Sequence, residues 1–582
     1  MIKQHPLARS LVTTRTWPFV TDLVVVLCFL ALFLGIIQMG TYWMAKPMPA
    51  VVISHSVRAL PLYAFYSIGR MGLAYLLSLV FAVAYGYIAA YNPRVESWML
   101  AVLDILQSIP VLSFLPGVML AMIALFPGHQ LGIELGSIVL LFTSQVWNMA
   151  FSFYSSLKSI PKEMIEATRI YRYSAWQRFW QLEMPFAAIG LIWNSIVSVA
   201  SGWFVLIPCE MLTFGDHSFH LPGLGSYLYS AASADPVDIH ALFWGMMVLI
   251  FIIVATDQLI WRPLIAWSDK FKFEQVESAS RVTSPILTLL RHPSVLLRLP
   301  YRALDGIEEG LYRRFASTRA CRVVQPIDDE QARGSRLFSI LLGAFALAAL
   351  LWAGGQAIHL LHGVTWADVR LLLLGAGATY LRVSAALLIA ALWTIPVGVA
   401  IGSNPKLAQV LQPITQSVAS IPAPAFFPVL MLVLIRNGAG LGIGSIALML
   451  LGTQWYVLFN VIAGAMAIPS DLKEAATVYR FTRWQRWTRL ILPGIFPYLI
   501  TGMVTASGGA WNTSILAEYG TLGDRTLQTI GLGAQISAAT NGSNFSTLLL
   551  ATVLMATMVV TMNRLVWRRL YRLAETRYKL ES

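Results

Sequence analysis

Long apolar stretches separated by short polar ones run along most of this chain. A run of about 18 or more apolar residues with few charges can cross the hydrocarbon core of a bilayer as a helix. Backbone polar groups must be paired within the chain there, so the runs predict helices rather than open strands. The pattern predicts an all-α integral membrane protein with about twelve transmembrane helices. We place them near residues 19–41, 63–91, 98–125, 135–157, 186–212, 239–262, 336–358, 368–402, 408–435, 440–464, 494–518 and 545–567.

The second six runs repeat the first six. Matching positions lie 308 residues apart and include Ile160 and Ile468, Pro185 and Pro493, Trp203 and Trp511, and Glu210 and Glu518. This self-similarity indicates a tandem duplication. Six spans per half give both halves the same orientation, so the repeat predicts two parallel membrane domains related by an axis along the membrane normal. We expect a first domain at 1–262, a cytoplasmic linker with amphipathic helices at 263–335, and a second domain at 336–582.

Composition agrees with a membrane protein and settles its orientation. The chain is 57% apolar and 12% charged, with a mean hydropathy of +0.67. Its net charge of +13 would suggest a nucleic-acid partner in a soluble protein. Here the basic residues flank spans, as cytoplasmic loops do, so we expect the lipid bilayer and no nucleic acid as partner. Both termini are basic and are expected in the cytoplasm.

Two polar segments interrupt the apolar pattern at matching places. They are "EATRIYRYSAWQRFW" from Glu166 and "EAATVYRFTRWQRWT" from Glu474. Ser159 and Ser470 stand before early acidic residues, which predicts a serine-capped helix in each cytoplasmic loop. Such a helix, carrying arginines and aromatics, could enter a groove on another protein. The alternative is a surface helix at the lipid headgroups, with its tryptophans in the interface: Trp176, Trp180, Trp484 and Trp487.

These segments, with the closing prolines Pro185 and Pro493, resemble the EAA loop of permease subunits in binding-protein-dependent ABC importers. The "SIP" segments and the "AEY" step at Glu518 look most like the nitrate, taurine, sulfonate and bicarbonate branch. The resemblance implies a type I importer permease with two permease domains fused in one chain. It implies coupling to a cytoplasmic ATPase dimer through these residues: Glu166, Ala167, Thr168, Tyr171, Arg172, Tyr173, Glu474, Ala475, Ala476, Tyr479, Arg480 and Phe481.

The same resemblance implies the rest of the assembly. An external, periplasmic substrate-binding protein would deliver the substrate, and a small anion such as nitrate, bicarbonate or a taurine-like sulfonate is expected. ATP and Mg would bind the partner ATPase, so the chain itself is expected to be a transport subunit without cofactors, not an enzyme. It would be a multi-pass protein of the bacterial inner membrane. The chain contains no Gly-Lys pair, so it lacks the phosphate loop that binds ATP in many ATPases.

The sequence departs from the family pattern inside the loop itself. The usual glycine after the EAA turn is Arg172 in the first copy and Arg480 in the second, and Thr168 replaces the second alanine. Glycine would allow a tight backbone turn. The arginines therefore predict a variant docking surface, with a carboxylate on the partner as a possible contact.

Several residues are candidates for the translocation pathway, each with a plainer alternative. Glu210 and Glu518 are gate residues, or carboxylates that lie at the interface or cap a loop helix. Prolines break helices and free carbonyl groups, so the "SIP" segments either line the pathway or only kink a helix. Trp203 and Trp511 line it or pack in the core. The candidates are Ser108, Pro110, Trp203, Glu210, Ser420, Pro422, Trp511, Asn512 and Glu518.

Two other functions remain open. A self-contained twelve-helix secondary transporter could also have two parallel halves, but that class usually carries ionisable residues inside its spans, and few are recognised here. A membrane scaffold without transport would leave the two matched loops unexplained.

Overall fold

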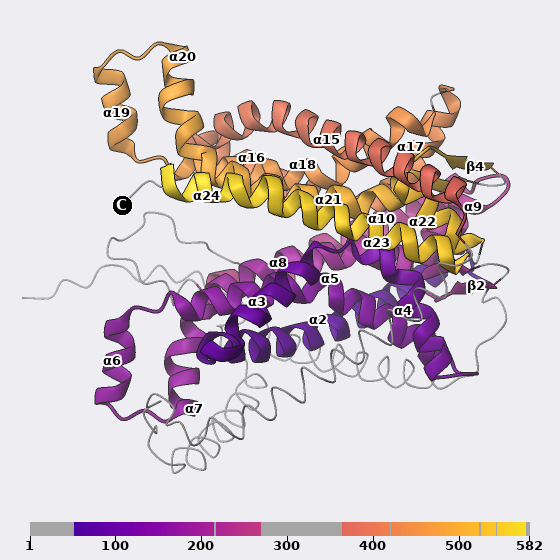
Figure 1. Ribbon diagram of the computed structural model, residues 1–582, viewed down its shortest axis with the longest axis horizontal. Helices are drawn as coiled ribbons and strands as arrows, with labels where there is room; N and C mark the ends of the chain where they lie inside the picture. Colours follow the sequence, from indigo (N-terminus) through magenta and orange to yellow (C-terminus); the bar gives the residue numbers. More distant parts are fainter. Residues whose placement is uncertain are drawn as a thin grey trace, which may run out of the picture.

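The computed structural model describes residues 52–214, 217–268, 364–419, 421–438, 440–522, 525–542 and 544–577. Within these ranges the regular structure is helical apart from two short antiparallel hairpins. The first half and the second half form two bundles that lie side by side with their long axes parallel (Figure 1). The all-α membrane fold expected from the apolar runs is confirmed.

The first half begins with helices that fold back and forth along the long axis of the molecule. It comprises a 3₁₀ turn (Val57–Ala59), α2 (Leu60–Tyr91), α3 (Pro93–Ser108), α4 (Val111–Leu125), α5 (Gln130–Lys158), α6 (Lys162–Ile170), α7 (Ala175–Arg178), a π-helical turn (Phe179–Glu183), α8 (Met184–Cys209), β1 (Met211–Phe214), β2 (His217–His220), α9 (Leu224–Ser233), α10 (Ile239–Thr256), a second π-helical turn (Asp257–Trp261) and α11 (Arg262–Ser268).

The second half repeats this order, and from α19 to α22 every boundary is shifted by 308 residues. It comprises α15 (Trp366–Gly402), α16 (Pro405–Ala419), α17 (Ala423–Arg436), α18 (Leu441–Ala467), α19 (Ser470–Val478), α20 (Arg483–Arg486), a π-helical turn (Trp487–Ile491), α21 (Leu492–Ala517), β3 (Tyr519–Leu522), β4 (Arg525–Gln528), α22 (Leu532–Asn541), α23 (Phe545–Met562), a π-helical turn (Asn563–Trp567) and α24 (Arg568–Arg577).

Eight of the described helical stretches are long and apolar enough to cross a membrane, four in each half. The expected continuous spans at 98–125 and 408–435 are wrong, because each is broken into two shorter helices, α3 with α4 and α16 with α17. Pro110 and Pro422 stand at the breaks in extended conformation. A proline lacks the amide that a continuous helix needs and disfavours helical geometry in the residue before it. The expected spans at 19–41 and 336–358, and nearly all of the expected linker, lie outside the described residues.

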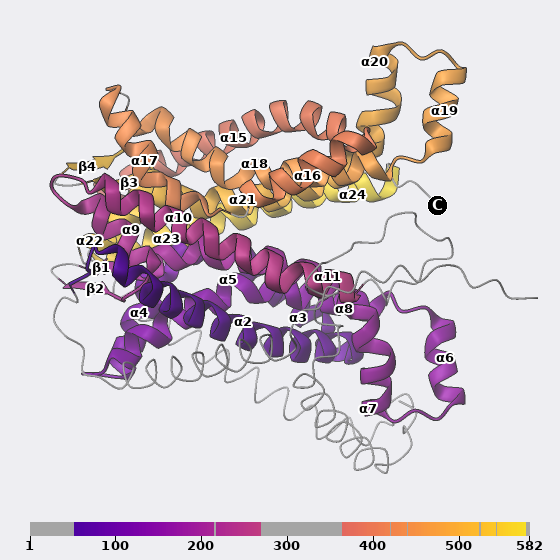
Figure 2. The ribbon, with the colours of Figure 1, turned by 180° about the vertical axis from the view of Figure 1, so that it is seen from behind.

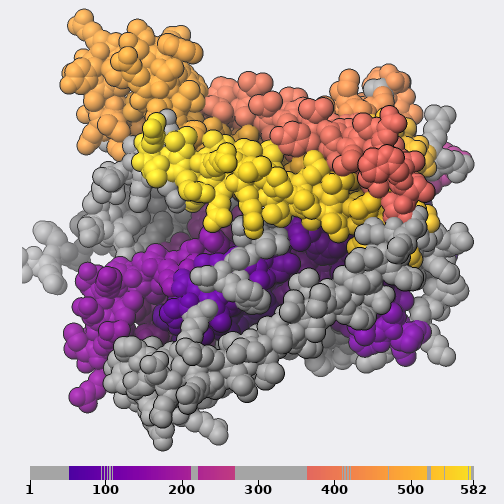
Figure 3. Space-filling model, viewed as in Figure 1, coloured from indigo at the N-terminus to yellow at the C-terminus, as the bar shows by residue number. Residues whose placement is uncertain are grey.

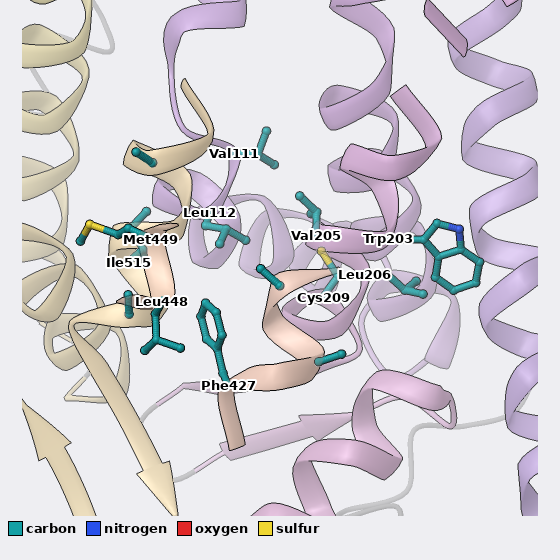
Figure 4. Packing of buried hydrophobic residues seen from close by; sticks show 14 of the residues in the cluster. Val111, Leu112, Trp203, Val205, Leu206, Cys209, Phe427, Leu448, Met449 and Ile515 are labelled. Carbon is teal, nitrogen blue, oxygen red and sulfur yellow. The ribbon is translucent and has the colours of Figure 1, made fainter. Parts of the chain in front are cut away.

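The two halves share one apolar core. Buried side chains from both form a single cluster that includes Leu112 and Trp203 of the first half and Phe427 and Ile515 of the second. Figure 4 shows the Phe427 ring among these side chains. A hydrogen bond also crosses between the halves, from the Thr552 hydroxyl to the Ser113 carbonyl oxygen at 3.1 Å. The second, C-terminal half occupies the upper part of the space-filling view, and the first half occupies the lower part (Figure 3).

Candidate functional site

Both polar segments leave the bundles at the same end of the molecule. α6 and α19 stand apart from the long helices, and α7 and α20 bring the chain back, as both ribbon views show (Figures 1 and 2). We call residues 162–173 and 470–481 the two loop helices, including the turn that ends each. This placement agrees with the expected parallel repeat, which puts both loops on one side of the membrane.

The loop helices do not begin as expected. Ser159 is the C-cap of α5, and Ser470 is the first residue of α19. The N-cap positions belong to Pro161 and Pro469, and neither makes a side-chain cap hydrogen bond. The fixed φ of proline suits the extended residue that precedes a helix, so the serine-cap prediction is wrong in both copies.

Each loop helix ends in a Schellman turn with an arginine at its centre. Arg172 and Arg480 have φ of 52° and 48°. The Arg172 amide donates to the Arg169 carbonyl oxygen at 3.0 Å, and the Tyr173 amide to the Thr168 carbonyl oxygen at 2.9 Å. The second copy makes the same pair of bonds, to the carbonyl oxygens of Thr477 and Ala476. This motif normally has glycine at the left-handed position, so in both copies arginine occupies a backbone position that favours glycine.

The loop helices have an inner and an outer face. Thr168 and Ala476, at matching positions, are buried, and the Thr168 hydroxyl donates to the Ile165 carbonyl oxygen at 2.7 Å. Beyond them the side chains face outward: Tyr171 is 74% exposed and Tyr479 76% exposed. The remaining coupling candidates divide between these faces. Glu166, Arg172, Glu474 and Arg480 are exposed, whereas Ala167, Tyr173, Ala475 and Phe481 are partly buried.

The repeated Trp-Gln step has a structural role that the sequence analysis missed. Gln177 and Gln485 are the third residues of α7 and α20, and each closes a capping box with the N-cap residue, Ser174 or Thr482. A serine or threonine followed three residues later by glutamine is the recognised signature of this box, so the signal was present in the sequence. Trp176 and Trp484, between the box partners, are exposed and Trp487 is partly buried.

The first loop is also fixed to the bundle by a buried carboxylate. Glu183 is fully buried and accepts hydrogen bonds from Arg178 at 2.6 Å and from the Tyr91 hydroxyl at 2.5 Å. The Arg178 guanidinium lies 4.8 Å from the centre of the Tyr91 ring. The matching residue in the second half is Ile491, so this anchor exists in one half only.

A second contact holds the end of α5, which leads into the first loop helix. Glu96 of α3 accepts a hydrogen bond from the Tyr154 hydroxyl at 2.6 Å and pairs with Lys158 at 2.9 Å. The Tyr154 hydroxyl and, next, the Lys158 ammonium lower the pKa of the Glu96 carboxyl. Glu96 therefore stays ionised and ties α3 to α5 beside the loop.

Glu210 lies at the end of α8 and caps a neighbouring helix. Its carboxylate accepts the Gly225 amide at 2.7 Å, at the N-terminus of α9, where a negative charge is favoured. It also accepts the Ser67 hydroxyl at 2.6 Å and pairs with Arg70 at 2.8 Å. Arg70 in turn binds Glu134 through two hydrogen bonds, of 2.6 and 2.7 Å. Arg70, Glu134 and Glu210 are all fully buried, which is the helix-capping alternative that the sequence left open.

Glu518 has the matching role in the second half. It accepts the Gly533 amide at 2.9 Å, the Thr379 hydroxyl at 2.8 Å and the Arg382 guanidinium at 2.9 Å. No counterpart of Glu134 exists, because Gly442 holds that position. Sequence analysis overlooked the two arginines and Glu134, since a single charge in an apolar run does not reveal its partner on another helix.

The other pathway candidates lie in different surroundings. Trp203 and Trp511 are buried in the core. Asn512 is partly buried and donates to the Gly508 carbonyl oxygen at 3.3 Å. Ser108 is the last residue of α3, Pro110 and Pro422 stand at the helix breaks, and Ser420 lies outside the described residues.

A cavity of about 290 Å³ lies between the two halves, on the side away from the loop helices. Its walls come from α4, α8, β1 and α9 of the first half and from α17, α21, β3 and α22 of the second. Leu112, Phe427 and Ile515, which are labelled in Figure 4, belong to its lining. None of the eight pathway candidates within the described residues does, so the cavity between the halves is lined by other residues than those expected.

Comparison of the sequence with known protein families gives a match in each half of the chain. The family model for the "binding-protein-dependent transport system inner membrane component" matches residues 82–259 and 394–579, which together are more than half of the chain. The two matches cover the two halves in turn, each with one loop helix.

Each of the individual relatives matches less than a third of the chain. The chain is 29% identical over 189 residues to the nitrate import permease protein NrtB of Leptolyngbya laminosa, which is 32% of this chain and 64% of that protein. It is 28% identical over 189 residues to the bicarbonate transport system permease protein CmpB of Synechococcus elongatus, 32% of this chain and 65% of that protein. It is 31% identical over 162 residues to the taurine transport system permease protein TauC of Escherichia coli, 28% of this chain and 55% of that protein.

These matches span less than two thirds of each relative's length, and the family assignment comes from the two model matches. With two copies of the family's region, each carrying a loop helix that ends in the same turn, the chain belongs to the binding-protein-dependent transport system inner membrane components, the permeases of ABC importers.

Proposed function

We propose that this chain supplies both permease domains of an ABC importer. Each loop helix docks onto one subunit of a separate cytoplasmic ATPase dimer, and movement of the ATPase subunits is transmitted to the two bundles. A substrate-binding protein outside the membrane delivers the substrate. ATP hydrolysis belongs to the partner and not to this chain.

One observation carries the proposal. Both loop helices project from the same end and expose matching tips, Ile170 with Tyr171 and Val478 with Tyr479, each between 74% and 78% exposed. Large apolar side chains gathered on a projecting tip usually mark a contact surface. Two equal tips on one chain suit a twofold partner, which a lone headgroup-binding helix would not require.

The buried charges are not evidence for a secondary transporter. Every ionised group in the Arg70 and Arg382 clusters has a partner of opposite charge, and the carboxylates of Glu210 and Glu518 also bind helix N-termini. Paired buried charges of this kind hold structure together, whereas an ion-coupling site needs a group that can exchange its ion.

For the substrate, a small anion is the first class to test. The similar permeases carry nitrate, bicarbonate or taurine in their names. The bacterial inner membrane, with both termini in the cytoplasm, is the location that fits this function.

The test is purification of the tagged chain from its own membranes in mild detergent, with mass spectrometry of the co-purifying proteins. We expect an ABC ATPase with the wild-type chain. It should be lost when Glu166, Arg172, Glu474 and Arg480 are all changed to alanine, because these exposed side chains lie on the loop helices. The matched control is Arg370→Ala, which removes an exposed charge near the start of α15, and which should retain the ATPase. A wild-type chain that transports in liposomes without any ATPase would overturn the proposal and favour a secondary transporter.

A further inference from the structure

The cavity between the halves is apolar on most of its walls. Aliphatic and aromatic side chains from both bundles line it, among them Leu115, Ile207, Phe427, Met431 and Leu516. The described residues that form the lining include no lysine, arginine, histidine, aspartate or glutamate. An ion that lost its water on entering the cavity would find no side chain of opposite charge, and burial of an unpaired ion in an apolar site is unfavourable.

The repeat is broken at the polar part of the lining. Tyr519, Ser537, Thr540 and Asn541 of the second half all line the cavity. The matching positions of the first half are Met211, Tyr229, Ala232 and Ser233. Of these four, Ser233 does not line the cavity, and Met211 and Ala232 have no hydrogen-bonding side chain. Tyr229 is the one that both lines the cavity and carries a hydroxyl.

The polar residues form one edge rather than a ring. The Asn541 side-chain amide donates to the Tyr519 hydroxyl at 2.9 Å, so the two side chains stand together. Ser537 and Thr540 lie on α22, the helix that ends at Asn541. They are three residues apart, which places them on one face of that helix. A ligand between the halves therefore meets four neutral hydrogen-bonding side chains from the second half and one, Tyr229, from the first, and the other side chains of the lining are apolar or glycine.

We propose that this cavity is a directional site for an organic substrate with an apolar body and one polar end. The inference rests on the proposed transport function and narrows its substrate class. The body contacts the apolar walls, and the polar end lies toward α22 and β3. A charged end would keep part of its water, since the lining supplies no cation. Nitrate and bicarbonate, which have no apolar body, gain little from this lining.

The size of the cavity agrees with a one-ring body. Cavities of roughly 150 Å³ lined by aliphatic side chains are known to hold benzene, and this one measures about 290 Å³. Burial of apolar surface supplies the binding energy and grows with the area covered. Body size should therefore control affinity more strongly than the charge of the polar end.

The test uses the full chain in lipid nanodiscs, four organic probes and, for comparison, nitrate. Benzenesulfonate and methanesulfonate are charged, and benzenesulfonamide and methanesulfonamide are their neutral counterparts. Each is titrated against the unfolding temperature, which rises with ligand bound to the folded state. Both phenyl compounds should act at concentrations at least about tenfold lower than both methyl compounds. Equal potency of methanesulfonate or nitrate, or no response to either phenyl compound, would overturn the inference.

Variants locate the binding. Leu516→Trp fills the cavity and should remove the response to the phenyl compounds, because Leu516 lines it and is only partly buried. Leu516→Ala removes apolar contacts from the lining and should weaken the response to both phenyl compounds, which keeps the test decisive if the tryptophan variant does not fold. Val433→Trp places the same bulk on α17 at a half-exposed site outside the lining and should change nothing. Unchanged responses in both Leu516 variants would contradict the assignment.

These results are independent of the ATPase. If no ATPase co-purifies, the proposed function fails, whereas probe binding is still measured on the chain alone. If the ATPase co-purifies and the phenyl compounds do not bind, the importer function stands and only the substrate class is wrong.

Discussion

Arg70 and Glu210 form an ion pair inside the first bundle, with Nη1 and Oε1 2.8 Å apart and both side chains fully buried. Arg382 and Glu518 form the matching pair in the second bundle, at 2.9 Å. Only the first pair has a second carboxylate, Glu134, and only the second arginine is partly exposed. Both halves therefore contain a capping carboxylate paired with an arginine, but the first half has two carboxylates for one arginine and the second half has one.

The two arginines should differ in their contribution to stability. Arg70→Met would leave the carboxylates of Glu134 and Glu210 buried without a cation, which we expect to cost at least about 3–5 kcal/mol. Arg382→Met should cost less, because it leaves one carboxylate, Glu518, without its cation instead of two, and because Arg382 is partly exposed. The measurement is the unfolding temperature and the monodisperse yield of each variant in the same detergent.

A second substitution can show whether Arg70 stabilises the protein through its charge or through the volume of its side chain. Adding Glu134→Met to Arg70→Met removes one of the two unpaired carboxylates and should recover part of the lost stability. An equal loss in single and double variants would show that the arginine acts through its volume and not its charge.

The glycines that face the capping carboxylates should not tolerate a methyl group. A Cβ on Gly223 would lie 2.3 Å from the Glu210 carboxyl, and one on Gly531 would lie 2.1 Å from the Glu518 carboxyl. Gly223→Ala and Gly531→Ala should therefore displace the carboxylate from its helix and cost about 1–3 kcal/mol or more. Thermal unfolding of the purified variants is the measurement.

The matched control is Gly377→Ala in α15, where a Cβ meets nothing within 4 Å. There alanine should stabilise the helix by up to about 1 kcal/mol. A loss of stability at Gly377 as large as at Gly223 would mean that any change of glycine in these helices is harmful, and that the carboxylate contact is not the cause.

Eight of the twelve expected spans and the repeat could be predicted, because hydropathy and spacing act locally along the chain. The charge clusters could not, since Arg70 meets Glu134 and Glu210 across 64 and 140 residues, through helix packing alone. Pro110 indicated a disturbed span, but only the structure shows two separate helices there. The left-handed turn at Arg172 was hidden for another reason. Arginine disfavours positive φ, so propensity pointed away from the turn that surrounding hydrogen bonds impose.

Glycine substitutions at the two turns distinguish the effect of backbone strain from the effect of the arginine side chain. Arg172→Gly and Arg480→Gly relieve the left-handed strain, and each should stabilise its turn by about 1 kcal/mol. If the guanidinium groups contact the ATPase, as proposed, the same variants should release the ATPase despite the easier turn. Co-elution with the ATPase and the unfolding temperature of the free chain are measured on the same preparations.

Asn is the appropriate control at these positions, because it also tolerates positive φ and carries no charge. Arg172→Asn and Arg480→Asn should release the ATPase in the same way. Full retention of the ATPase in the glycine and asparagine variants would mean that the arginines serve no docking contact.

The two loops should respond unequally to loss of their capping boxes. Thr482→Ala and Ser174→Ala each remove a helix cap, at a cost of about 1 kcal/mol. In the second loop Arg486 donates to the Thr477 hydroxyl at 3.3 Å and Lys473 to the Ala465 carbonyl oxygen at 3.5 Å, but Ile491 stands where the first loop has its buried carboxylate. In the first loop, buried Glu183 still holds Arg178 against Tyr91.

Hydrogen exchange of the loop peptides would show the difference. We expect exchange over 470–486 to rise roughly fivefold in the Thr482 variant, the factor that about 1 kcal/mol gives, and exchange over 162–178 to rise less in the Ser174 variant. Thr488→Ala is the control, because Thr488 is exposed and its hydroxyl donates only to the Trp484 carbonyl oxygen within the same helix. Equal responses in the two loops would contradict a stabilising role for Glu183, whereas the expected difference would mean that the first loop is held more rigidly than the second.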